Sequence, residues 1–248
     1  MITLPKKIIK SENKNPKKLL IISPPKRGKT TLVAGLKNCL IIDLEKGTDY
    51  VDALKIQANS LDELVEVGKA ILLENDKAKK PIYDYIAIDT ITKLEDIAKD
   101  LALKNYKNSA IGRNFDGDVN KFMQLPNGAA YLWVRQAFEK LYSFFSELTP
   151  CLILLGHLKR TAVMRDNAEI QATDIDLTGK LKNITCADMD AIGVLKRKDN
   201  QSILSFKTSE DDLVCGSRCE HLANQDILIA EKNESGFTYH WDKIFTND

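Results

Sequence analysis

The segment Ser23–Thr30 (SPPKRGKT) constrains the possible fold more than any other part of the chain. It matches the pattern G-x-x-x-x-G-K-[ST] at every fixed position except the first, where serine replaces glycine. This pattern has meaning only between a buried strand and a helix. Both are expected here, because the apolar run Lys18–Ile22 suits a buried strand and a helix is predicted from Lys29 to about Leu36. The segment therefore predicts a phosphate-binding loop within an α/β fold.

The side chains of this loop are those that bind a nucleoside triphosphate, and ATP with Mg²⁺ is the expected ligand. Backbone N–H groups of the loop and the helix N-terminus would cradle the phosphates. Lys29 would reach the β- and γ-phosphates, and the Thr30 hydroxyl would bind Mg²⁺. A side chain at Gly28 would crowd the phosphate, whereas serine at position 23 fits the turn with some backbone strain. The predicted nucleotide-binding residues are Ser23, Pro24, Pro25, Lys26, Arg27, Gly28, Lys29, Thr30 and Thr31.

Short apolar strands alternate with helices along the chain, which predicts βαβ units and a mainly parallel central sheet. Strands are expected at 18–22, 39–43, 85–89 and 151–155, and helices at 60–74, 92–106 and 130–148. Two later strands, 191–195 and 203–207, are close enough in sequence to add an antiparallel hairpin. We expect a basic N-terminal arm over 1–17, an α/β core flanked by helices over 18–210, and a C-terminal extension packed on the core over 211–248.

Two long polar segments, 107–129 and 159–179, are predicted to be loops. Loops of this length are uncommon inside a compact domain and are usually functional. The helix expected between them carries one apolar stripe, which predicts that it packs on the sheet. The stripe consists of Val134, Phe138, Leu141, Phe145 and Leu148.

A phosphate loop also needs an acidic residue at the end of a neighbouring strand to help bind the metal ion. Asp89 ends an apolar strand (YIAID) and is followed by Thr90, so Asp89 is the predicted metal ligand together with Thr30. Asp43 ends a comparable strand (CLIID), but Leu-Glu follows it rather than a hydroxyl side chain.

Composition narrows the class of protein. The apolar runs fall short of the roughly 20 residues that a membrane helix needs, and no apolar signal core follows the lysine-rich N-terminus. We therefore expect a cytoplasmic protein without a membrane partner. The net charge of +1 does not by itself indicate nucleic-acid binding. Cys215, Cys219 and His221 form a ligand-like cluster, but no other ligand pair lies near it in sequence, so zinc is not expected.

Two further strand ends resemble those of RecA-type ATPases. The segment Ile42–Glu45 (IDLE) resembles the one after the second RecA strand, which implies that Glu45 polarises the attacking water. From the residues alone, Glu45 could instead be a surface carboxylate near Lys46. The segment Leu154–His157 (LLGH) resembles the strand end where RecA has a glutamine that senses the γ-phosphate. This implies the same role for His157, with a pH dependence near neutrality, although a lone histidine is more often structural.

The chain resembles RecA-like ATPases over about residues 16–210, and most of all the short phage-type ATPases grouped with single-strand annealing and recombination proteins. That group combines a proline-rich phosphate loop, a D-x-E-x-G segment (Asp43–Gly47), a strand ending in Asp-Thr, and a strand ending in His-x-Lys (His157–Lys159). The resemblance implies a DNA-stimulated ATPase that acts in phage-type recombination, in the host cytoplasm. The implied partners are single-stranded DNA, further copies of the chain with ATP between subunits, and a single-stranded-DNA-binding protein.

The resemblance also assigns DNA contacts by location. The segment after His157 corresponds to one DNA-binding loop of RecA, and the segment 107–129 to the other. The implied DNA-binding residues are Arg113, Lys121, Lys159, Arg160 and Arg165. Lys196 and Lys198 lie where RecA has two lysines that reach the ATP of a neighbouring subunit, but a charged hairpin turn explains them equally well.

Two other functions are compatible with the residues. A P-loop phosphotransferase for a small molecule would place Arg160 and Arg165 in a lid over its second substrate, but it leaves Glu45 and His157 unexplained. A slow ATP-gated DNA-binding scaffold would keep the nucleotide site with little or no hydrolysis. Nucleotide turnover with and without single-stranded DNA separates these alternatives.

Overall fold

The computed structural model describes residues 13–165, 168–207 and 215–246, together with residues 4, 6–8 and 10–11 of the arm. For residues 160–165 and 168–173 only the backbone is described. Within these described ranges, no helix combines the length and the apolar composition needed to cross a membrane.

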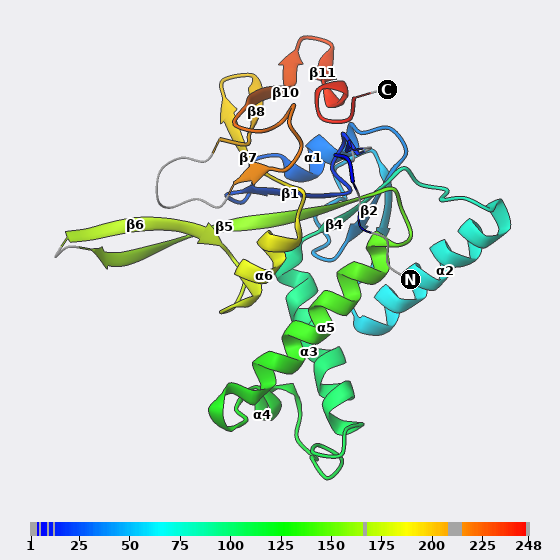
Figure 1. Ribbon diagram of the computed structural model, residues 1–248, viewed down its shortest axis with the longest axis vertical. Coiled ribbons are helices and arrows are strands. Elements are labelled where there is room, and N and C mark those ends of the chain that lie inside the picture. Colours follow the sequence, from blue (N-terminus) through cyan, green and yellow to red (C-terminus); the bar gives the residue numbers. More distant parts are fainter. Residues whose placement is uncertain are drawn as a thin grey trace.

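The described strands form a sheet with a parallel part and an antiparallel part (Figure 1). The parallel strands follow the order β3-β2-β4-β5-β1-β7, and β8, β10 and β11 continue the sheet in antiparallel pairs. The mainly parallel α/β fold with an antiparallel C-terminal part is therefore confirmed. The strands are β1 (Lys18–Ser23), β2 (Cys39–Asp43), β3 (Leu54–Gln57), β4 (Tyr85–Asp89), β5 (Cys151–Arg165), β6 (Ala168–Ile175), β7 (Ala191–Lys198), β8 (Gln201–Ser205), β9 (Gly216–Ser217), β10 (Asp226–Asn233) and β11 (Gly236–Tyr239).

Successive strand residues enter two different apolar clusters, because their side chains point to opposite faces of the sheet. In β1, Leu20 and Ile22 join the cluster that includes α3 and α5, whereas Leu19 and Ile21 join the cluster that includes α1 and the C-terminal segment. This two-sided burial explains why the central strands are unbroken apolar runs. The helices are α1 (Lys29–Ala34), α2 (Leu61–Ala78), α3 (Ile91–Lys107), α4 (Val119–Met123), α5 (Ala129–Ser146) and α6 (Leu181–Asp188), with 3-10 turns η1 (Pro126–Gly128) and η2 (Trp241–Lys243).

Local signals in the sequence determine where the longer helices begin. Ser60 Oγ accepts a hydrogen bond from Glu63 N at 3.2 Å, and Glu63 Oε2 accepts one from Asn59 N at 2.6 Å, so a capping box begins α2 near the expected start at residue 60. The helix continues beyond its expected end near residue 74, to Ala78. All residues of the predicted apolar stripe are buried, although α5 ends at Ser146 and Leu148 lies just after it.

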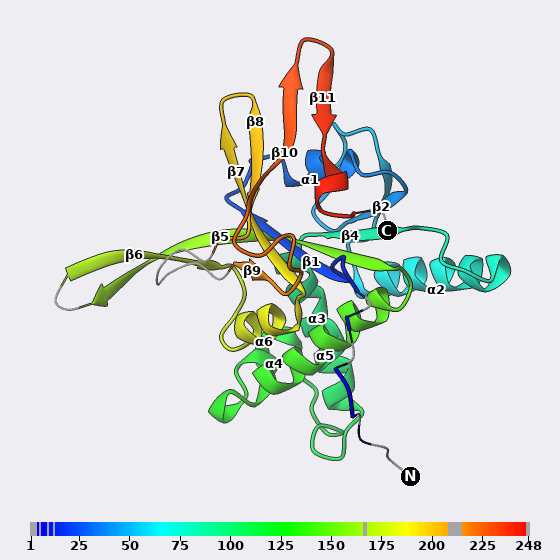
Figure 2. The ribbon, with the colours of Figure 1, turned by 45° about the horizontal axis from the view of Figure 1, so that its top comes forward.

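The segment 159–179 is mostly not a loop, so this prediction was wrong. β5 continues to Arg165 and pairs with β6 in an antiparallel hairpin that projects from the sheet (Figures 1 and 2). A projecting hairpin does not need the unbroken apolar runs of the central strands. The polar composition of this segment therefore indicated a loop, although its backbone forms strands.

The segment 107–129 is also more ordered than the sequence indicated, since it contains α4 and η1. Phe122 of α4 is fully buried, and its ring lies 5.4 Å from the ring of Tyr106 in α3. Aromatic packing of this kind leaves no helical period in so short an element. The edge strand β3 and the short helix α6 were not predicted either, and all residues of β3 are exposed.

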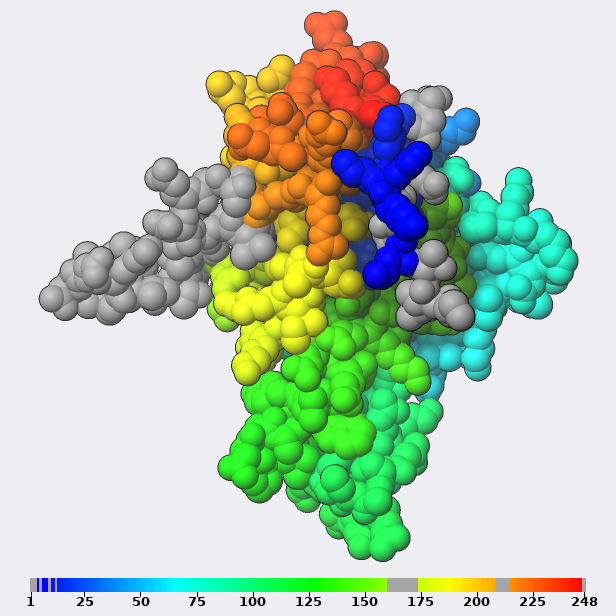
Figure 3. All heavy atoms as spheres, in the orientation of Figure 1, coloured from blue at the N-terminus to red at the C-terminus, as the bar shows by residue number. Residues whose placement is uncertain are grey.

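The chain's C-terminal residues lie beside the N-terminal arm (Figure 3). Asn15 Nδ2 donates a hydrogen bond to Thr246 O at 2.8 Å, and Thr246 N donates to Asn15 Oδ1 at 3.0 Å. Trp241 of η2 is buried, and its Nε1 donates to Leu32 O of α1 at 3.2 Å. The C-terminal segment therefore contacts the helix that follows the phosphate loop.

Candidate nucleotide-binding and catalytic site

The phosphate loop leaves the carboxyl end of β1 and enters α1, as the sequence predicts. Gly28 has a φ of 89°, a left-handed conformation that strains any residue with a Cβ. Among the described residues, no atom lies within 4 Å of the point that a Cβ would occupy, so the backbone angle is what requires glycine in the protein itself. Ser23 is a fully buried strand residue and is not among the residues with positive φ, so the expected strain is not found there.

The ammonium group of Lys29 meets several acceptors at the end of the sheet, and the residue is only 5% exposed. Nζ donates to Ser23 O at 3.3 Å and to Ser23 Oγ at 3.1 Å, and it lies 3.2 Å from His157 Nδ1. An ammonium group only donates, so Nδ1 is the acceptor and the proton of the neutral ring is on Nε2. Burial lowers the pKa of Lys29, whereas Asp89 and Glu45 act in the opposite direction.

The Glu45 carboxylate is held between a histidine and a threonine. His157 Nε2 lies 3.7 Å from Glu45 Oε2, and Thr90 Oγ1 donates to Glu45 Oε1 at 2.6 Å. The His157 ring is the main cause that lowers the pKa of Glu45; burial opposes this effect, and the Thr90 hydroxyl and Lys29 add to it. The carboxylate is therefore ionised at neutral pH, the form in which it can accept a proton.

Asp43 organises the loop that carries Glu45. Its fully buried carboxylate accepts hydrogen bonds from Glu45 N (2.9 Å), Gly47 N (3.2 Å), Thr48 N (2.9 Å) and Thr48 Oγ1 (2.7 Å). Burial alone would raise the pKa of Asp43, but these hydrogen bonds, led by those from Thr48, lower it below the ordinary value. This role was not predicted, although an aspartate at a strand end followed by a glycine turn is a signal for such a loop.

Asp89 and Thr30 are in direct contact at the carboxyl end of β4. Thr30 Oγ1 donates to Asp89 Oδ2 at 2.5 Å, and Asp89 is 5% exposed. Burial raises the pKa of Asp89, the Thr30 hydroxyl opposes this, and the charge of Glu45 adds to it. The Asp89–Thr90 peptide bond is cis. A hydroxyl and a carboxylate side by side are oxygen ligands suited to Mg²⁺, which takes few ligands from the protein when phosphates and water supply the rest.

The rest of the described chain offers no group of three or more His, Cys, Asp or Glu side chains suited to a metal ion. This includes the cysteine–histidine cluster of the C-terminal segment. There, His221 Nε2 lies 3.0 Å from Ile244 O, and Cys215 Sγ donates to Lys207 O at 2.5 Å.

The phosphate loop and the side chains of Glu45, Asp89 and His157 line a cleft of about 680 Å³, a volume typical of a nucleotide-sized ligand site. The loop residues from Pro25 to Thr31 form one wall, and Glu45, Asp89 and His157 lie on another. The exposed Tyr50 also borders the cleft. The structure thus brings together the predicted catalytic and metal-binding residues. Ser23 and Pro24, which were also predicted, are not among the residues that line the cleft.

Arg197 lines the same cleft and was not among the predicted residues. The sequence drew attention to Lys196 and Lys198, which belong to β7 and not to the predicted turn over 196–201. Strand alternation places Arg197 on the face opposite to both lysines. Lys196 Nζ donates to Ser205 Oγ of β8 at 3.2 Å. The two-residue period of β7 is the signal that would have identified Arg197.

The predicted DNA-binding residues belong to two separate elements. Arg113 and Lys121 are exposed on the segment that joins α3 to α5, whereas Lys159 is exposed on β5. Arg160 and Arg165 lie on the β5 backbone, and their side chains are outside the described atoms. In Figures 1 and 2 the α4 segment and the β5–β6 hairpin extend in different directions. The structure therefore does not join these residues into one patch.

The mainly parallel sheet, the phosphate loop and the side chains that meet at its edge together define a P-loop protein of the α/β class. In particular, the chain belongs to the AAA domain family, whose model matches residues 15–219. Among solved structures, the crystal structure of the RadB recombinase is similar to the chain, with a TM-score of 0.41, 13% sequence identity and 90% of each chain covered. No curated protein matches the sequence.

Proposed function

We propose that this chain hydrolyses ATP in the presence of Mg²⁺. The observation that carries the proposal is the continuous set of contacts from Lys29 through His157 to Glu45 and Thr90 along one side of the nucleotide-sized cleft. An ionised carboxylate and a buried lysine that converge on such a cleft are typical of a catalytic site.

Each residue has a distinct role in the proposed reaction. Glu45 orients a water molecule and accepts its proton, while the water oxygen bonds to the γ-phosphorus and the bond to the β-phosphate oxygen breaks, which releases ADP and phosphate. Lys29 stabilises the charge on the phosphate oxygens. Thr30 and Asp89 would hold Mg²⁺, which would neutralise charge on the same oxygens. His157, which lies between Lys29 and Glu45 at the carboxyl end of a central strand, is proposed to sense the γ-phosphate through its ring.

The proposed macromolecular partner is single-stranded DNA, in recombination or strand annealing of the phage type. Support comes from the motifs that resemble those of RecA-type ATPases and from β5 itself, because the strand that carries His157 continues directly into the projecting hairpin. Cationic side chains on this hairpin, including the exposed Lys159, are suited to contacts with phosphates that do not depend on base sequence but weaken with salt.

The test is release of phosphate from ATP with and without single-stranded DNA, for the parent chain, Lys29→Ala and Glu45→Gln. Single-stranded DNA should accelerate phosphate release by the parent chain. Lys29→Ala should lose both binding and turnover, whereas Glu45→Gln should bind ATP without hydrolysing it. Glu66→Gln on the exposed face of α2 is the matched control and should behave as the parent does.

The alternatives give different outcomes in the same assay and in a DNA-binding assay. No DNA binding at low salt, with or without ATP, would contradict the DNA part of the proposal. Rapid turnover that needs a metabolite and ignores DNA would identify a phosphotransferase. A Glu45→Gln chain whose slow hydrolysis and DNA binding match those of the parent would identify a scaffold.

We also propose that the chain assembles with ATP between subunits and that Lys196 or Lys198 reaches the neighbouring nucleotide. Support comes from their place on β7, next to Arg197 at the rim of the cleft. Mixing inactive Lys29→Ala chains with inactive Lys196→Ala/Lys198→Ala chains tests this arrangement. Recovered hydrolysis supports an action across subunits, because only a mixed interface then has all the residues. No recovery contradicts it.

A further inference from the structure

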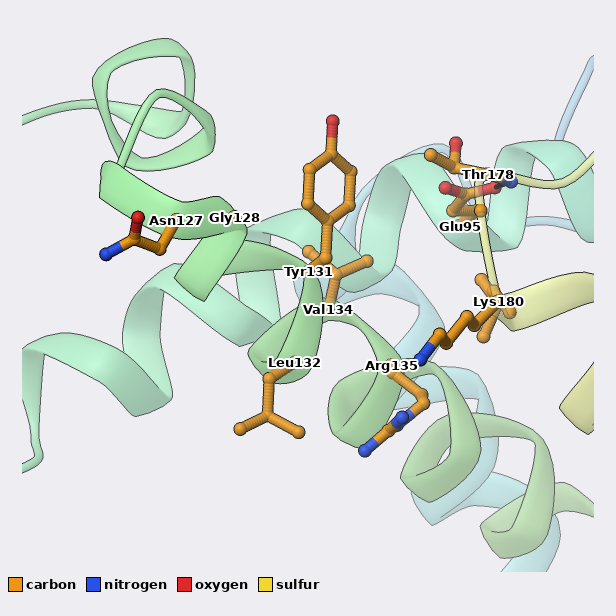
Figure 4. Close-up of a pocket in the computed structure, with 11 residues that line it drawn as sticks. Glu95, Asn127, Gly128, Tyr131, Leu132, Val134, Arg135, Thr178 and Lys180 are labelled. Carbon is orange, nitrogen blue, oxygen red and sulfur yellow. Dashed lines mark hydrogen bonds between the residues drawn. The ribbon is translucent and has the colours of Figure 1, made fainter.

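Another cleft, of about 430 Å³, lies outside the nucleotide site (Figure 4). It is formed by the first turns of α5, by Glu95 of α3, and by the chain that follows β6. Figure 4 shows the Tyr131 ring projecting from the beginning of α5, with Arg135 one turn further along the same helix. Lys180 approaches from the segment after β6.

The lining of this cleft combines an aromatic face with positive charge. Tyr131 is 50% exposed, so its ring is available to a ligand. Arg135 and Lys180 contribute cationic groups. In the described part of the chain, no side chain caps the N-terminus of α5, so its first N–H groups favour an anion at the same place. Glu95 is the opposing charge, but its Oε2 already accepts a hydrogen bond from Thr178 N at 3.0 Å.

A nucleotide unit has the matching chemistry, because its base stacks on aromatic rings and its phosphate binds cationic groups. We propose that this cleft binds a single strand of DNA, with a base on Tyr131 and a backbone phosphate at Arg135 and Lys180; this rests on the DNA part of the proposed function. A single strand is the favoured source because its bases are unstacked and can enter a cleft, whereas duplex bases cannot without flipping.

The segment after β6, which forms one wall of the cleft, is hydrogen-bonded to elements of the ATP site. The segment after β6 contacts β5, the strand that carries His157, because Asp176 N donates to His157 O at 3.0 Å. The same segment contacts the beginning of α3, because Thr92 Oγ1 donates to Asp176 O at 3.0 Å. Thr90, the residue before α3, donates to Glu45. A bound DNA strand that shifts the 176–178 segment would therefore move the backbone that positions His157 and Glu45.

The experiment is fluorescence anisotropy of a labelled oligothymidylate of about 16 nucleotides, at saturating ATP. Tyr131→Ala should weaken binding about tenfold, because one stacked base is lost. Tyr131→Phe keeps the ring and should bind as the parent does. Arg135→Ala should reduce the slope of log affinity against log salt by about 0.7, the value for one phosphate contact on a single strand. Phe237→Ala, an exposed aromatic residue on β11, is the control and should have no effect.

The outcomes separate this inference from the function on which it rests. A parent chain that binds no single-stranded DNA overturns the DNA-binding function itself. A parent that binds, with Tyr131→Ala and Arg135→Ala unchanged, overturns only the assignment of this cleft. Binding of a free mononucleotide with the same dependence on Tyr131 and an affinity equal to that of the oligonucleotide overturns the choice of a strand. Thermal melting of each variant identifies any loss of folding, and Tyr131→Phe keeps the test valid if Tyr131→Ala is unstable.

Discussion

Glu45 depends on neighbours from three parts of the chain for its position and charge. Asp43 shapes its loop, Thr90 binds one carboxylate oxygen, and His157 faces the other. None of these partners changes the chemical nature of the carboxylate; they fix its direction and keep it ionised. A substitution that removes only the basicity of this side chain therefore measures how much the proton acceptor contributes to the rate of hydrolysis.

Glu45→Gln should lower kcat for ATP hydrolysis by about 100-fold or more, since it removes the proton acceptor but keeps the size of the side chain. The affinity for ATP should change little, because Lys29 and the loop backbone remain. Steady-state kinetics and equilibrium binding of a fluorescent ATP analogue measure the two effects. A large loss of affinity with an unchanged kcat would contradict the assigned role.

Asp43→Asn should destabilise the fold by about 1–3 kcal/mol, because a buried carboxylate that accepts several hydrogen bonds is replaced by a poorer acceptor. The folded-state pKa of Asp43 lies below its ordinary value of about 3.9. Its contribution is therefore complete above that ordinary value and is lost as the pH falls through the lower, folded value. Urea unfolding from pH 7 into the acid range should show this loss for the parent and a shallower slope for the variant. Parallel curves would contradict the prediction.

At the scale of elements, the β5–β6 hairpin combines a buried strand with a projecting one. Residues 151–157 of β5 lie in the central sheet, and the continuation pairs only with β6 among the described strands. The central part was predicted as a strand because it is an unbroken apolar run. The projecting part was predicted as a loop, because it has no second layer to cover it and so no apolar pattern.

Replacing residues 161–172 by a short glycine-containing turn should leave the core folded, since the described residues of this range pair with one another and with no strand of the central sheet. The midpoint of thermal unfolding should change little, and basal ATP hydrolysis should persist. Affinity for single-stranded DNA should fall, as the anisotropy assay measures. Loss of cooperative unfolding would show instead that the hairpin is part of the core.

At the scale of the whole molecule, the C-terminal segment completes the phosphate-binding part. α1 has only six residues and is too short to be stable alone. Trp241 Nε1 and the Tyr239 hydroxyl donate to the carbonyl oxygens of Leu32 and Thr31, at 3.2 Å each. The rings of Trp241 and Phe245 stack with centroids 5.9 Å apart. Residues far apart in the sequence thus stabilise the helix that orients Lys29 and Thr30.

Trp241→Ala should lower the free energy of unfolding by about 3–5 kcal/mol, the range for removal of a large buried aromatic side chain. Trp241→Phe keeps most of the ring and removes one hydrogen bond, so it should cost about 1 kcal/mol. Urea unfolding measures both values, and ATP with Mg²⁺ should raise the stability of either variant by mass action. Equal stabilities for the parent and Trp241→Ala would show that the C-terminal segment does not support α1.

Local patterns and burial in the sequence were sufficient to predict the phosphate loop, the order of the central strands along the chain, and the acids that end β2 and β4. Which of these residues meet depends on the packing of the whole chain. Lys29 and His157 are 128 positions apart, and Thr90 and Glu45 are 45 apart, so the parallel register of the sheet brings each pair together. The β5–β6 hairpin and the contact of Trp241 with α1 also depended on long-range packing, for which a single sequence carries no periodic signal.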